Sequence, residues 1–252
     1  MKVLALGNPR TGTNYVLESL AIKHNLMNLG GFLHDNLDPL SVEYDEKNKK
    51  ILSCSNQKIL NTLEESFLAS NKHCNILLET STDWCAKIFI RDLKHISFQN
   101  SIKLFNNNDI SKVLIYRSDL LDTALSYAIA RKYKKFTVYN KNELSFKDKV
   151  VIDCKTDTDF LVCFKKVCRD FKLLREYASL FNWSTIYDYS TLTGDSFVDF
   201  QLKINPPCIK LFSKEEKLEK LKNFNLIEQE IKEFLNQENL SYNEYINTEK
   251  RK

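Results

Sequence analysis

The 252-residue chain lacks several features that would place it in a broad class at once. It has no apolar run of 18 residues, so we expect no transmembrane helix. Its start, residues 1–4, enters an apolar run directly without a signal-peptide pattern, so we expect a cytoplasmic protein. Its seven cysteines include no Cys-x-x-Cys pair, and its four histidines include no His-x3-His pair. We therefore expect reduced, mostly buried thiols, with disulfides as the alternative, and no metal site.

Composition and length favour one folded domain. A hydrophobic content of 43% with 12% aromatic residues excludes a disordered chain. The formal net charge of +4 suits an anionic cofactor and does not by itself indicate nucleic acid. With neither repeats nor a clear linker, we expect one α/β domain over 1–252, with insertions over about 31–55 and 135–157 and C-terminal helices over about 213–240. We expect no membrane partner, and the sequence leaves a homodimer open.

The most informative segment is residues 7–14, Gly-Asn-Pro-Arg-Thr-Gly-Thr-Asn, which follows the apolar run 3–6. Its Gly-x4-Gly spacing is that of the nucleotide-triphosphatase P-loop, but Thr13 stands at the position of the loop lysine and Asn14 at that of the Mg²⁺-binding hydroxyl. Backbone N–H groups at a helix N-terminus remain, and Arg10 adds a permanent charge. The pattern predicts a metal-free site for an anionic nucleotide. The alternative is a tight strand-to-helix turn with Arg10 in a surface ion pair.

A second segment has the same strand-to-helix character. Residues 113–116 are apolar and predict a buried strand, and Asp119 is a good N-cap for the helix that follows. Arg117 leaves the end of the strand, and Ser126 lies two turns into the helix. Both side chains suit a second phosphate, with a salt bridge from Arg117 to Asp119 or Asp122 as the alternative.

Together these segments resemble the sulfotransferases that use 3′-phosphoadenosine 5′-phosphosulfate (PAPS), most closely the bacterial trehalose-type and related phage or glycan enzymes. In that family a Pro-Arg/Lys-Ser/Thr-Gly-Thr/Ser loop binds the 5′-phosphosulfate; the loop residues here are Pro9, Arg10, Thr11, Gly12, Thr13 and Asn14. A strand-ending Arg and a helix Ser bind the 3′-phosphate, which implies that role for Arg117 and Ser126. A weaker likeness places Tyr189 at the family's Tyr-Glu-Asp-Leu, against the adenine or in the core.

The resemblance implies an α/β fold in three layers, with a mostly parallel central sheet flanked by helices as in the P-loop nucleotide kinases, and small hairpin insertions. It implies transfer of a sulfuryl group from PAPS to a hydroxyl of a carbohydrate or small-molecule acceptor, without a metal, releasing adenosine 3′,5′-bisphosphate. Two alternatives stay open: a P-loop nucleotide kinase or phosphotransferase, and a non-catalytic nucleotide- or partner-binding relative. The acceptor cannot be read from the chain.

The resemblance also suggests catalytic roles. Arg10 is expected to stabilise charge on the leaving phosphate. The general base is expected on the segment after the first helix, where we nominate His34, then Asp35, with Glu43 as a further alternative. Lys87 falls where many relatives carry a strand lysine near the transferred group.

Hydrophobic periodicity predicts the remaining elements and a helix-covered parallel sheet. The expected helices span about 14–26, 56–71, 92–106, 158–181, 214–221 and 226–237. The expected strands span 2–6, 113–116, 184–187 and at least one of 75–79 and 86–90, with hairpin arms at 41–45 and 50–54 and a chain break at Gly30-Gly31.

Overall fold

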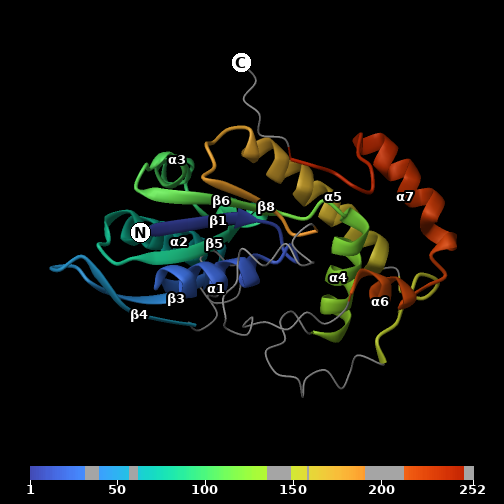
Figure 1. The fold of residues 1–252 in the computed structure, drawn as a ribbon, viewed down its shortest axis with the longest axis horizontal. Helices are drawn as coiled ribbons and strands as arrows, with labels where there is room; N and C mark the ends of the chain where they lie inside the picture. The colour runs from blue at the N-terminus through green and yellow to red at the C-terminus, as the bar shows by residue number, and fades with distance from the viewer. Residues whose placement is uncertain (32–39, 57–61, 135–148, 158, 191–212, 247–252) are drawn as a thin grey trace.

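Strand β1 (Lys2–Gly7) lies at the centre of a five-stranded parallel sheet, with helices packed on both faces (Figure 1). The computed structural model describes residues 1–31, 40–56, 62–134, 149–157, 159–190 and 213–246. The strand order is β2 (Met27–Gly31), β5 (Trp84–Phe89), β1, β6 (Ile110–Tyr116) and β8 (Thr185–Asp188). This confirms the expected three-layer α/β fold with a parallel sheet.

The register brings the carboxyl ends of the strands to one edge. Gly7, the last residue of β1, pairs with Phe89 of β5 and with Ile115 of β6. Asp188 ends β8 opposite Tyr116. The segments that follow all four strands therefore emerge together, which is where α/β proteins of this kind bind ligands.

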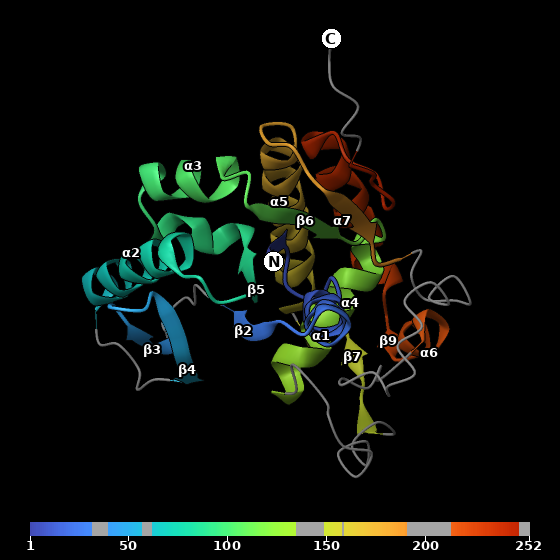
Figure 2. The ribbon, with the colours of Figure 1, turned by 60° about the vertical axis from the view of Figure 1, so that its left-hand side comes forward.

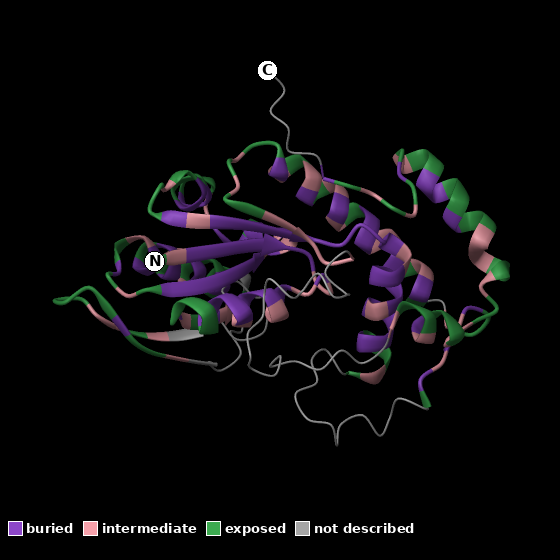
Figure 3. Cartoon of the chain, viewed as in Figure 1, coloured by how far each residue is buried: buried purple, intermediate pink, exposed green. Residues whose placement is uncertain are grey.

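Alternation along β1 sends its side chains into two separate cores. Val3 and Ala5 pack with helix α1 (Thr13–His24) on one face of the sheet. Leu4 and Leu6 join the larger core on the other face. That core is covered by α2 (Leu63–Glu79), α3 (Phe98–Asn106), α4 (Leu120–Tyr133) and α5 (Asp159–Ala178), whose arrangement Figure 2 shows. Figure 3 shows β1, β5 and β6 buried along almost their whole length.

Smaller elements lie around this framework. A 3-10 helix, η1 (Ile90–His95), directly follows β5. The remaining described elements are β3 (Leu40–Asp45), β4 (Lys50–Asn56), β7 (Ile152–Asp153), α6 (Lys214–Glu219), β9 (Leu221–Lys222) and α7 (Asn225–Glu238). The expected hairpin is confirmed as the antiparallel pair β3–β4, and β7 pairs in parallel with β9. The expected helix over 158–181 and strand over 184–187 are confirmed as α5 and β8.

Two expected helices have the wrong limits, and capping explains both. The helix expected over 56–71 is α2, whose N-cap Thr62 accepts a hydrogen bond from the Glu65 N–H, so the apolar run 75–79 belongs to the helix. The helix expected over 92–106 is divided into η1 and α3. Ser97 caps α3 by accepting a hydrogen bond from the Asn100 N–H.

Strand β2 was not expected from the sequence. The Gly30-Gly31 pair was interpreted only as a break, and both residues lie within β2. The strand pairs irregularly with β5, and its register shifts between Asn28 and Gly31. Its partner β5, which is paired on both sides, provides the order that the local sequence does not.

The described cysteines are free thiols, and five of the six are buried; Cys208 lies outside the described residues. Burial raises the pKa of Cys74, Cys85 and Cys168 to about 12, so these thiols are poor nucleophiles. Within the described ranges, no helix combines the length and apolarity needed to cross a bilayer, and no three His, Cys, Asp or Glu side chains gather as a metal site.

Buried His73 on α2 predicts a pH-dependent stability. Burial, with a smaller effect of Lys72, lowers its pKa from 6.5 to about 4. The unfolded chain therefore takes up a proton that the folded chain does not, and this contribution to stability is complete above pH ~6.5 and lost as the pH falls toward 4. We expect the free energy of unfolding to drop by about 3 kcal/mol through this group between pH 7 and 4. Denaturant titrations of wild type and His73→Gln at both pH values measure it; equal pH dependence in the two proteins would contradict it.

Candidate active site

The loop after β1 folds through two left-handed residues. Arg10 has φ 69° and Gly12 has φ 74°. Thr11 Oγ1 donates a hydrogen bond to the Asn8 carbonyl at 2.7 Å, which closes the loop on itself. A non-glycine residue with positive φ costs on the order of 1–3 kcal/mol, and such strain gathers at functional sites. The loop therefore holds the backbone of Arg10 in a left-handed conformation, which is unfavourable for a residue other than glycine.

Gly12 is the N-cap of α1, and none of the side chains that the structure describes caps this helix end. The first turn contains no acidic residue, and the Val16 N–H is bonded to the Gly12 carbonyl at 3.0 Å. Backbone N–H groups and the helix dipole make such an end attractive to an anion. Thr13 is buried as the first residue of the helix, so its contribution here is through the backbone.

The Tyr189 ring covers Gly12. A Cβ atom added to Gly12 would lie 2.0 Å from Tyr189 Cδ2 and 2.2 Å from its Cε2. The Tyr189 N–H donates to the Tyr116 carbonyl at 2.8 Å, which extends the pairing of β8 with β6 by one residue. The Arg117 guanidinium carbon lies 5.3 Å from the ring centre. Tyr189 thus contacts both sequence motifs.

A direct hydrogen bond joins the two motifs. Arg10 Nε donates to Ser126 Oγ at 3.4 Å, across 116 residues of sequence. Helix α4 carries Ser126 at the position expected from the sequence, two turns into the helix. Residues that were expected to contact different phosphates of one nucleotide therefore lie within reach of a single small ligand.

Arg117 is buried, with 6% of its surface exposed. It forms an ion pair with Asp122 Oδ2, the pairing that the sequence left open as the alternative to a phosphate contact. Its Nε atom is buried and has no hydrogen-bond partner within the described residues. Asp122 therefore holds Arg117 in place, and the Nε donor is not used within the described residues.

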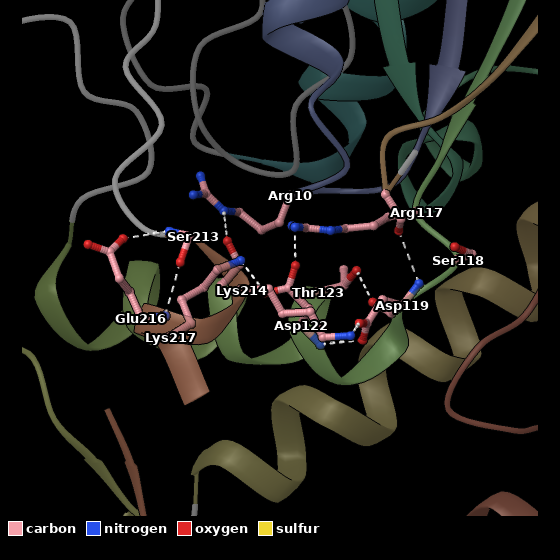
Figure 4. A network of polar contacts seen from close by, with 12 residues as sticks. Arg10, Arg117, Ser118, Asp119, Asp122, Thr123, Ser213, Lys214, Glu216 and Lys217 are labelled. Carbon is pink, nitrogen blue, oxygen red and sulfur yellow. Dashed lines mark hydrogen bonds and ion pairs between the residues drawn. The ribbon is translucent and has the colours of Figure 1, made fainter. Parts of the chain in front are cut away.

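Helix α6 contributes two lysines that sequence reasoning missed. Lys217 pairs with Asp122 Oδ1, and Lys214 Nζ lies 2.5 Å from Asp119 Oδ2 (Figure 4). The hydrogen bond from Lys214 to Asp119 raises the pKa of that lysine. The sequence predicted a charged amphipathic helix here, and nothing in its pattern distinguishes these lysines from solvent-exposed ones.

Lys87 lies beside the N-terminus of α1. Its side chain is buried on β5, and its ammonium donates a hydrogen bond to Asn14 Oδ1 and lies 5.2 Å from the centre of the Phe89 ring. Glu18, one turn along α1 from Asn14, has its pKa raised by burial and lowered again in part by Lys87. The structure thus brings Lys87 to the phosphate loop.

The other nominated residues are placed differently. His34 and Asp35 lie outside the described residues. Glu43 is exposed on the hairpin, where it accepts a hydrogen bond from Ser53 Oγ at 2.8 Å. Pro9 lines a small pocket with Asn8, Thr123, Tyr127, Val167 and Asp170, on the side of the loop that faces α4 and α5.

The Tyr189 contact predicts an unusually costly Gly12→Ala substitution. Left-handed alanine alone costs about 1–2 kcal/mol, and the ring must also move. Gly30 is a matched control, because it has φ 63° but nothing within 4 Å of an added Cβ. We expect Gly12→Ala to lower the free energy of unfolding more than Gly30→Ala in denaturant titrations, and the two costs to become equal in a Tyr189→Ala background. If Gly12→Ala still lowered the free energy of unfolding more than Gly30→Ala in the Tyr189→Ala background, the Tyr189 ring would not be the cause of the difference.

Comparison of the chain with protein-family models, curated proteins and solved structures finds no match in any of the three. The likeness to sulfotransferases therefore depends on the two motifs themselves. Their placement at one edge of the sheet is a property of this fold.

Proposed function

We propose that the protein is a PAPS-dependent sulfotransferase acting on a hydroxyl of a carbohydrate or small molecule. The observation that carries the proposal is the Arg10–Ser126 hydrogen bond, which joins the loop of residues 9–14 to the segment of residues 117–126. Arg10, the α1 N-terminus and Arg117 are three sources of positive potential at this edge. A nucleotide with phosphates at both its 3′ and 5′ positions suits such a divided site.

The reaction breaks the bond between sulfur and the bridging oxygen of PAPS and forms one between sulfur and the acceptor oxygen. The proton of the acceptor hydroxyl passes to a general base, for which the sequence nominates His34 or Asp35. Negative charge develops on the leaving phosphate, where Arg10 and the helix N-terminus stabilise it. As in loose phosphoryl transfer, alignment and electrostatics supply most of the acceleration.

Asn14 and Lys87 distinguish this proposal from a nucleotide kinase. In a P-loop kinase the residue at the Asn14 position is a Ser or Thr whose hydroxyl binds Mg²⁺. Here the Asn14 amide oxygen accepts a hydrogen bond from the ammonium of Lys87. A fixed cation thus stands beside the transfer site, where it can offset negative charge on the transferred group.

Ligand preference tests the cofactor assignment. We expect adenosine 3′,5′-bisphosphate to bind without metal, and Arg117→Ala to weaken it by about 1.5–3 kcal/mol, the value of a charge-assisted phosphate contact. Adenosine 5′-phosphate should bind equally to both proteins, since it lacks the 3′-phosphate. Titration calorimetry measures the binding of both ligands. Arg131→Ala is the control, because Arg131 is an exposed arginine in the last turn of α4. Preference of the wild type for ATP·Mg²⁺ over the bisphosphate would favour the kinase alternative instead.

Turnover tests the role of Arg10. Transfer of labelled sulfate from PAPS across a panel of hydroxyl acceptors first identifies a substrate. With that substrate, Arg10→Ala should lower kcat on the order of 10²–10³-fold while changing the affinity for adenosine 3′,5′-bisphosphate much less, because the charge that it stabilises develops during transfer. Unchanged turnover would exclude this role, and transfer to no acceptor would favour the non-catalytic alternative.

A further inference from the structure

Three buried charges meet on helix α4. The two oxygens of Asp122 contact different cations: Oδ2 pairs with Arg117 from the end of β6, and Oδ1 pairs with Lys217 from α6 (Figure 4). All three side chains are more than nine-tenths buried. One carboxylate is therefore shared by two cations that approach it from separate segments of the chain.

The three groups together carry a net charge of +1. Burying a charge costs several kcal/mol unless an opposite charge compensates it, and a simple Arg117–Asp122 pair would already be compensated. The neighbouring Asp119 does not neutralise the excess, because it has its own partner in Lys214. Arg117 also retains a buried Nε with no hydrogen-bond partner within the described residues. Within the part of the chain that the structure describes, this cluster thus has a net positive charge and a buried donor without an acceptor, and both suit an anion.

Lys217 accounts for that net positive charge. Without it, the carboxylate of Asp122 would neutralise Arg117 alone and repel an incoming phosphate. With it, Asp122 is balanced from its other oxygen, and the charge of Arg117 remains available to a ligand. We propose that Lys217 is a positioning residue for the 3′-phosphate subsite: by sharing Asp122 it keeps Arg117 able to bind phosphate without contacting the ligand itself. This inference rests on the proposed function, because it takes the ligand of Arg117 to be the 3′-phosphate.

Charge-changing variants give the proposal a test with a characteristic sign pattern. Lys217→Gln should raise the Kd for adenosine 3′,5′-bisphosphate by about tenfold, comparable to the loss of a charge-assisted contact, and leave that for adenosine 5′-phosphate unchanged. Asp122→Asn should not weaken binding of the bisphosphate, because the amide oxygen can still accept a hydrogen bond from Arg117 and hold it in place, while the negative charge that neutralises Arg117 is lost. The double variant, Lys217→Gln with Asp122→Asn, restores the net charge of +1. Its Kd for adenosine 3′,5′-bisphosphate should therefore return to within about threefold of the wild-type value.

Two controls separate positioning from folding. Lys222→Gln makes the same charge change at an exposed side chain on strand β9, which follows α6, and should alter the Kd by less than about twofold because solvent screens it. Lys217→Arg retains the charge and should retain the affinity. Thermal unfolding of each variant, with and without the bisphosphate, reports whether the fold is intact.

The outcomes distinguish this inference from the proposed function. If the wild type binds the bisphosphate but Lys217→Gln weakens both nucleotides alike, or the double variant binds as weakly as Lys217→Gln, then Lys217 has only a structural role and the inference is wrong. Weaker binding by Asp122→Asn alone would overturn it too, even if Lys217→Gln failed to fold. If the wild type does not bind the bisphosphate more tightly than adenosine 5′-phosphate, the proposed cofactor fails, and the inference fails with it.

Discussion

The site depends on the parallel pairing of β1 between β5 and β6 in one register. Because Gly7 ends opposite Phe89 and Ile115, the phosphate loop, η1 and the Arg117 segment start from one edge. The chain leaves β1 toward α1 on one face and leaves β6 toward α4 on the other. Adjacent strands whose connections diverge in this way leave a crevice at their carboxyl ends, and a right-handed crossover on each side produces it.

Local patterns predicted those parts of the fold that local interactions determine. The phosphate loop, α4 with its Asp119 cap and the long stripe of α5 all lie where the sequence placed them, since each combines a strong periodicity with a clear boundary. Strand β2 was missed because its order comes from its neighbour β5. The Arg117–Asp122 pair was one of the two salt bridges that the sequence offered as alternatives, because both residues lie in one short segment. The contact of Asp122 with Lys217 joins α4 to α6, which lie far apart in the sequence, and a local pattern contains no information about such a pairing.

The network around Asp122 also makes α6 part of the framework of the site. A six-residue helix has little stability of its own, and here a capping box formed by Ser213 and Glu216 and ion pairs to α4 hold it in place. Buried ion pairs give uncertain gains in stability but strong geometric preferences. Their role in this protein is therefore best understood as fixing where α6 and the guanidinium of Arg117 lie relative to each other.

Strand β8 makes the aromatic side of the site depend on an edge of the sheet. It is a strand of four residues that, among the described strands, pairs with β6 alone, yet Asp188 at its end accepts hydrogen bonds from the Ser118 and Ser190 N–H groups, and Tyr189 follows it. A strand that is paired on one side opens locally at a lower cost in free energy than a strand that is paired on both sides. Local opening of β8 would carry Tyr189 away from Gly12 while β1, β5 and β6 stay paired. Access to the N-terminus of α1 is therefore linked to the stability of this one edge.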